Sequence, residues 1–262
     1  MTKKLNLKQC LQWLSLVELK QQPLTADECY ESLHNVLPPP PQPGSPTRRF
    51  SKDKVRSYLK DLESNGDIIS VSSVVTSYSI TKKGYENELQ LSHSLLKRIR
   101  IVHQSLHIIQ ERVGGRMDTP PVMVPKEDRE FVRSLLSVKD VVRYYILDAL
   151  QHEPKQSLTE LQKNMLSSYG WTCSPSYFLL IGRNEMSEGV DEFDDPLEHP
   201  VILLQSQYEG KLSRRKIRTY SISEPILAEE WKEIYRRDAA ESIGKAITFT
   251  NNLLSLLGYD KS

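Results

Sequence analysis

The 262-residue sequence has no long hydrophobic run, few cysteines and almost no net charge. No apolar stretch approaches the ~18 residues needed to cross a bilayer, so we expect no membrane-spanning segment. Lys8, Gln12 and Glu18 interrupt the first apolar stretch, so we expect no signal peptide. The three widely spaced cysteines predict free thiols in a reducing compartment rather than a disulfide framework. These features indicate a cytoplasmic protein.

The sequence also lacks the local motifs of common enzymes. It has no G-x-x-x-x-G-K-[ST], no G-x-S-x-G, no H-E-x-x-H and no paired C-x-x-C. His103 and His107 lie four residues apart, a spacing that can hold zinc, but no acidic or cysteine residue is placed to complete four ligands. We therefore expect a protein that is not an enzyme and that holds no metal and no cofactor.

Charge is unevenly distributed, although the net charge is only +1. Residues 1–113 carry 16 Lys+Arg against 11 Asp+Glu, a net +5, and residues 114–262 carry 19 against 23, a net −4. In the second part, acidic residues gather over 185–198 and basic residues over 211–218. Near-neutrality argues against a protein that coats nucleic acid indiscriminately, but it permits one basic face.

The first part of the chain has the pattern of three helices followed by a β-hairpin. Apolar periodicity, capping boxes and glycine stops define these elements. The predicted elements are helices over 7–19, 25–37 and 52–64, and strands over 68–71 and 78–80. Lys82-Lys83-Gly84 is predicted to end this unit.

The same order of elements is predicted again in the second part of the chain. The elements are helices over 138–150, 157–168 and 174–188, and strands over 201–207 and 216–223. The last strand is Ser77-Tyr-Ser-Ile-Thr81 in one copy and Thr219-Tyr-Ser-Ile-Ser223 in the other. We interpret the pattern as an internal duplication; chance similarity between short strands is the alternative.

Each predicted hairpin precedes a long amphipathic helix, over 85–113 and over 225–257. The expected fold is mainly α with small β hairpins, in the α+β class. The expected organisation is a first domain over 1–84, a connecting helix over 85–113, a linker over 114–136, a second domain over 137–223 and a C-terminal helix over 224–262.

Three helices with a two-stranded wing are the elements of the winged helix-turn-helix. The third helix ends in Leu62-Glu-Ser-Asn-Gly66, and the wing closes in Tyr78-Ser-Ile-Thr-Lys-Lys-Gly84. This stretch resembles the PadR-type transcriptional regulators, over residues 7–84 and, more weakly, over 138–223. The resemblance implies two winged-helix units, regulation of transcription and binding of double-stranded DNA. It also implies that the long helices form a homodimer, or a pseudo-dimer between the two units.

A recognition helix offers its first side chains to base edges, while flanking lysines and arginines neutralise phosphates. Lys52, Arg56 and Lys60 share one helix face, away from the apolar positions. In the second unit the basic residues lie in the wing. The predicted DNA-binding residues are Arg48, Arg49, Lys52, Lys54, Arg56, Ser57 and Lys60 in the first unit, and Arg214, Arg215, Lys216 and Arg218 in the second. Solvated surface charge is the alternative interpretation.

Two further functions stay open at this stage. The first wing, over 72–77, has no basic residue, and the presumed second recognition helix, over 177–183, is mostly apolar. Both features favour a non-catalytic tandem winged-helix adaptor that binds protein, as in ESCRT-II subunits and SMC–kleisin accessory subunits. A component that acts on DNA only inside a larger transcription or restriction complex is the third interpretation.

Overall fold

The computed structural model describes residues 4–36, 51–71, 75–116, 118–191, 193–197, 201–209 and 216–258. Within these residues the structure is mainly helical, with one three-stranded and one two-stranded antiparallel sheet. The predicted α+β class is therefore confirmed. None of the helices described is both long enough and apolar enough to cross a membrane.

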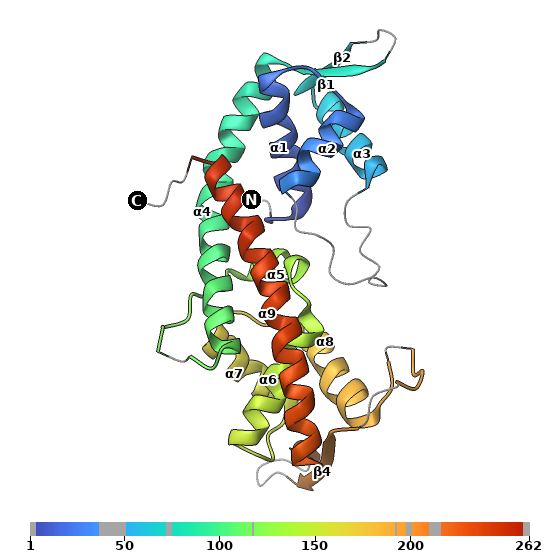
Figure 1. The fold of residues 1–262 in the computed structure, drawn as a ribbon, viewed down its shortest axis with the longest axis vertical. Coiled ribbons are helices and arrows are strands. Elements are labelled where there is room, and N and C mark those ends of the chain that lie inside the picture. Colours follow the sequence, from blue (N-terminus) through green and yellow to red (C-terminus); the bar gives the residue numbers. More distant parts are fainter. Residues whose placement is uncertain are drawn as a thin grey trace. The chain divides into compact units, whose positions relative to one another are not determined.

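The chain divides into two compact units, which are described separately. The first consists of the described residues of Met1–His103 and Lys245–Ser262, and the second is Gln104–Gly244. Two long helices, α4 (Lys82–Val113) and α9 (Pro225–Leu256), each contribute residues to both units (Figure 1).

The first unit contains the predicted three helices and hairpin, together with one unpredicted strand. Its elements are α1 (Leu7–Gln21), β1 (Leu24–Thr25), α2 (Ala26–Val36), α3 (Lys52–Ser64), β2 (Ile68–Val71) and β3 (Ser77–Ile80). The strand order is β1-β3-β2, so the short β1 covers one side of the hairpin. A two-residue strand is too short to produce an alternating pattern, and for this reason β1 was missed.

The core of the first unit lies between α1, α2, α3 and the start of α4 (Figure 1). Trp13 of α1 is fully buried, and its ring N–H donates a 2.8 Å hydrogen bond to the Ser92 hydroxyl of α4. The apolar positions Val55, Leu59 and Leu62 of α3 are buried, as their spacing predicted.

The long helix α4 begins at Lys82 rather than at the predicted residue 85, so Gly84 lies inside its first turn. A Cβ on Gly84 would lie 2.0 Å from the backbone oxygen of Asp67 and 2.7 Å from the Ile80 side chain. The glycine therefore allows α4 to start directly against the hairpin. Sequence analysis interpreted this close-packing glycine as the end of the unit that precedes the long helix.

The second unit repeats the order with longer hairpin strands. Its elements are η1 (Lys126–Asp128), α5 (Arg129–Leu135), α6 (Val138–His152), α7 (Leu158–Tyr169), α8 (Pro175–Leu179), η2 (Leu180–Glu188), β4 (Leu203–Glu209) and β5 (Lys216–Ile222). The segment assigned to a linker thus contains η1 and α5, and Phe131 and Val132 of α5 are buried. The predicted third helix is α-helical only in α8 and continues in η2 as a wider π-helix, until Gly189 ends it with a φ of +72°.

The two units share the same strand pairing and the same helix cap at matching residues. In the first, Leu24 pairs with Tyr78 of β3; in the second, Gln156 pairs with Tyr220 of β5. Directly after each of these residues comes a capping box, Thr25 with Glu28 and Ser157 with Glu160. The repeated register supports the interpretation of an internal duplication.

All three cysteines are buried free thiols, as predicted. Burial raises the pKa of Cys10 to about 12, that of Cys29 to about 11 and that of Cys173 to about 12. The thiols therefore stay protonated at neutral pH and act as small apolar core residues.

Candidate nucleic-acid interface

Helix α3 is defined by clear start and stop signals. The hydroxyl of Ser51 accepts a 3.4 Å hydrogen bond from the Lys54 backbone N–H, which caps the first turn. At the other end Gly66 takes a φ of +76°, a conformation that suits glycine and ends the helix. The predicted bounds of this helix are confirmed.

The face of α3 opposite the core carries the predicted basic side chains. All five of the predicted residues within α3 are exposed: Lys52, Lys54, Arg56, Ser57 and Lys60. The buried apolar stripe holds this helix on the unit, so the basic face needs no rearrangement to meet a ligand.

Acidic residues of α2 lie beside this basic face. The Arg56 guanidinium lies 3.3 Å from the Asp27 carboxylate and 3.4 Å from that of Asp53. The Lys52 ammonium lies 3.7 Å from Asp27 and 3.9 Å from Glu31. Arg56 and Asp27 are about half exposed, at 51% and 55%, so water screens these ion pairs. Sequence analysis did not predict these partners.

The remaining predicted residues are described only in part. Arg48, Arg49, Arg214 and Arg215 lie outside the described residues. The backbone of Lys216 pairs with Glu209 at the start of β5, and its side chain is outside the described part. Arg218 is exposed on β5, opposite Gln207.

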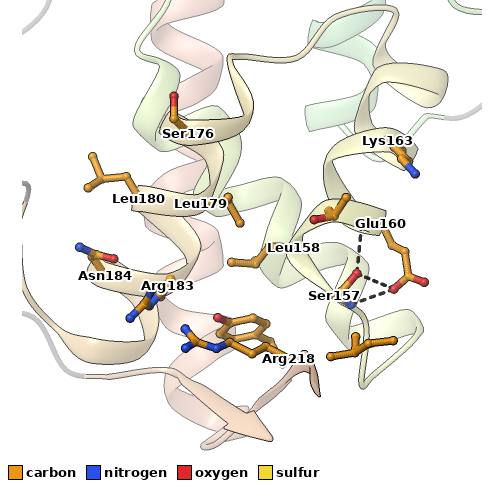
Figure 2. Close-up of a pocket in the computed structure, with 13 residues that line it drawn as sticks. Ser157, Leu158, Glu160, Lys163, Ser176, Leu179, Leu180, Arg183, Asn184 and Arg218 are labelled. Atoms are coloured by element: carbon orange, nitrogen blue, oxygen red, sulfur yellow. Dashed lines mark hydrogen bonds between the residues drawn. The ribbon is translucent and has the colours of Figure 1, made fainter. Parts of the chain in front are cut away.

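Arg218 borders a groove within the second unit, which α7, α8, η2 and β5 enclose (Figure 2). The groove has a volume of about 670 Å³. Within the described part of the chain, Lys163 of α7 and Arg183 of η2 are its other cations. Sequence analysis did not predict either residue as part of a site. Arg183 lies on the helix face opposite the buried residues Phe178 and Ile181, so helical spacing could have predicted that it is exposed.

Arg183 and Arg218 lie close to one buried hydroxyl, that of Tyr220. Burial raises the pKa of Tyr220, while the positive charges of Arg218 and Arg183 act to lower it. The Nε of Arg183 also donates a 2.9 Å hydrogen bond to Glu188, which raises the pKa of Arg183. The Arg183 guanidinium is therefore a cation at neutral pH.

A buried ion pair holds η2 in place against α6. Glu185 is fully buried, and its carboxylate lies 2.5 Å from the Arg143 guanidinium and 2.8 Å from the Lys139 ammonium. Gly182, one turn earlier, lies against Leu158 of α7, where a Cβ would come within 2.5 Å of a methyl group. These contacts fix the position of Arg183 between them.

No cluster of three or more His, Cys, Asp and Glu residues suited to a metal ion is present among the residues that the structure describes. His103 instead contacts Thr250, with 2.8 Å between Nδ1 and Oγ1. Comparison of the chain with protein families, with curated proteins and with solved structures finds no match.

Proposed function

We propose that the chain is a DNA-binding transcription regulator with tandem winged helix-turn-helix units, in which α3 is the recognition helix. One observation carries the proposal. The first unit has the order α1-β1-α2-α3-β2-β3 with a β1-β3-β2 sheet, and its third helix buries an apolar stripe while exposing a basic face. One fold can serve many functions, and the basic face of α3 is the feature that favours DNA as the ligand.

The ion pairs on α3 are weak enough for a phosphate to replace them. Exposed salt bridges contribute roughly 0–1 kcal/mol each. Hydrogen bonds from lysine or arginine to a phosphate are charge-assisted, and binding releases counterions from the duplex. Lys52 and Arg56 can therefore exchange Asp27 for DNA phosphates at little cost.

Apolar side chains on the long helices support the proposal of a homodimer or pseudo-dimer. Leu89 of α4 is 55% exposed, and Ile226 of α9 is 81% exposed. Exposed apolar residues of this size favour contact with a partner surface. Light scattering during gel filtration tests the proposed homodimer. The mass of a dimer supports it, and the mass of a monomer contradicts it.

Fluorescence anisotropy with a mixed-sequence duplex of about 20 base pairs, at about 50 mM salt, tests the DNA contact. The triple variant K52Q/R56Q/K60Q removes three exposed cations from α3. The control K97Q/K126Q/R237Q removes three exposed cations elsewhere. We expect the first variant to bind at least about 10-fold more weakly than the control. Equal affinities contradict the proposed role of α3.

A protein-binding adaptor is the second candidate function, and a specific observation favours it. The first hairpin exposes Ile69 at 53%, Val71 at 48% and Val75 at 60%. Apolar side chains at these positions suit a protein partner better than a phosphate backbone. A folded protein that binds no duplex even at about 50 mM salt would favour this function.

A further inference from the structure

The groove of the second unit has the size of a small-molecule site. Its volume of about 670 Å³ falls within the range of roughly 300–1,000 Å³ that ligand pockets occupy. All of its walls belong to one unit: α7 on one side, α8 and η2 on the other, and β5 across the end (Figure 2). Its shape therefore depends only on contacts within that unit.

The charge of the groove is positive. Among the residues that the structure describes, the groove is lined by three cations, Lys163, Arg183 and Arg218, and by one carboxylate, that of Glu160. The Glu160 carboxylate accepts hydrogen bonds from the Ser157 backbone N–H at 3.0 Å and the Ser157 hydroxyl at 2.7 Å, so the cap of α7 already occupies it (Figure 2). Glu188 contacts Arg183 through Nε, yet the Arg183 side chain stays 46% exposed.

The rest of the lining is divided between apolar and hydrogen-bonding side chains. The apolar wall consists of Leu158, Leu179, Leu180 and Ile217. Leu179 is 42% exposed, so its side chain is accessible to a ligand in the groove. Ser176 and Asn184 lie on the same helix face as Leu180 and Arg183 and add neutral hydrogen-bonding groups.

We propose that this groove binds a small organic anion, with Arg183 and Arg218 holding the anionic group and the leucine side chains covering an apolar ring or chain. Guanidinium groups bind oxyanions through paired, charge-assisted hydrogen bonds, which suit carboxylates, sulfonates and phosphate monoesters. The apolar wall distinguishes such a ligand from a free inorganic ion, which has no apolar part to bury. This site does not depend on DNA binding by α3.

The probe is 8-anilino-1-naphthalenesulfonate, an organic anion with an apolar ring system whose fluorescence rises in apolar surroundings. Its uncharged analogue, N-phenyl-1-naphthylamine, lacks the sulfonate. We expect the folded full-length chain to bind the sulfonate saturably. The double variant R183Q/R218Q should bind it about 10-fold or more weakly, since each arginine supplies a charged hydrogen bond.

The matched control is R116Q/R237Q, which removes two exposed arginines of the same unit away from the groove. It should bind the sulfonate within about 2-fold of the wild type. Circular dichroism shows that each variant is folded. The K52Q/R56Q/K60Q variant should keep wild-type dye binding, which separates this test from that of the α3 interface.

Four results would overturn the proposal. One is the absence of saturable dye binding, and another is equal binding by R183Q/R218Q and the control. The third is equal affinity for the sulfonate and its uncharged analogue, because the arginines would then contribute nothing. A duplex that displaces the dye, together with weaker duplex binding by R183Q/R218Q, would assign the two arginines to DNA phosphates and also overturn it.

Discussion

The Arg56 guanidinium lies 3.3 Å from the Asp27 carboxylate, so the basic face of α3 is joined to the helix that precedes it. The same carboxylate lies 3.7 Å from the Lys52 ammonium. One acidic residue thus faces two of the four α3 cations proposed to contact DNA. This relationship makes the DNA affinity of the chain adjustable through Asp27.

Replacing Asp27 with asparagine should tighten binding to a mixed-sequence duplex by roughly 2- to 5-fold at low salt, because both cations lose a competing anion. Stability should change by less than about 1 kcal/mol, since the pairs are exposed. Fluorescence anisotropy and urea unfolding measure the two quantities. The control D118N removes an exposed carboxylate from the second unit and should leave affinity unchanged. Unchanged affinity in D27N would show that these cations do not face the duplex.

The buried Glu185 should be required for stability. In E185Q the Arg143 guanidinium, which is only 13% exposed, loses its closest charged partner and keeps Asp140 at 3.9 Å, so we expect a loss of about 3 kcal/mol in the free energy of unfolding. Chemical denaturation measures it. The control E130Q breaks an exposed pair with Arg133 and should cost less than about 1 kcal/mol. Similar small losses in both variants would mean that Glu185 does not hold η2 against α6.

Two glycine-to-alanine substitutions should change the stability of the protein in opposite directions. In G182A the new Cβ meets the Leu158 methyl groups at 2.5 and 2.9 Å, and overpacking of this kind costs roughly 1–3 kcal/mol. In G244A the Cβ meets nothing within 4 Å, so higher helix propensity should stabilise α9 by up to about 1 kcal/mol. Thermal melts of the two variants compare them directly. A stabilised G182A would contradict the close contact of η2 with α7.

The capping box of α7 should give the second unit an acid-sensitive contribution to stability. Hydrogen bonds from Ser157 lower the pKa of Glu160 below its ordinary value of 4.5. The contribution is therefore present above pH 4.5 and is lost as pH falls through the lowered value.

The S157A substitution should lower the free energy of unfolding by about 1 kcal/mol near neutral pH. The difference in this free energy between S157A and the wild type should become smaller between about pH 5 and pH 3. Urea unfolding across this range measures the difference. The exposed S167A variant of the same helix is the control and should show no such narrowing. A difference that stays constant with pH would show that Glu160 takes no part in the cap.

Local signals were sufficient to predict α3. Ser51 caps it, Gly66 ends it, and apolar residues recur at helical spacing between them. The two-residue strand β1 has no such signal, because only pairing with Tyr78, far along the chain, makes Leu24 part of a strand. The width of η2 likewise depends on tertiary contacts of its residues with α6 and α7, which periodicity does not encode.

In the candidate sites, too, local patterns predict some features, while others arise only when the chain folds. That the basic residues of α3 would be exposed followed from helix geometry. The carboxylates of α2 that neutralise them come from another element, and no periodic pattern in α3 predicts them. The groove needs Lys163, Arg183 and Arg218 from three elements that folding brings together, so sequence analysis found only Arg218.

The salt dependence of duplex binding tests the central claim most directly. The affinity of the wild type and of K52Q/R56Q/K60Q is measured from about 50 to about 200 mM salt. Each phosphate contact contributes a slope of about −0.9 to the plot of log affinity against log salt concentration. We predict a steep wild-type slope that becomes shallower by about 3 in the variant. A flat wild-type slope, or the same slope in both proteins, would contradict DNA binding through α3.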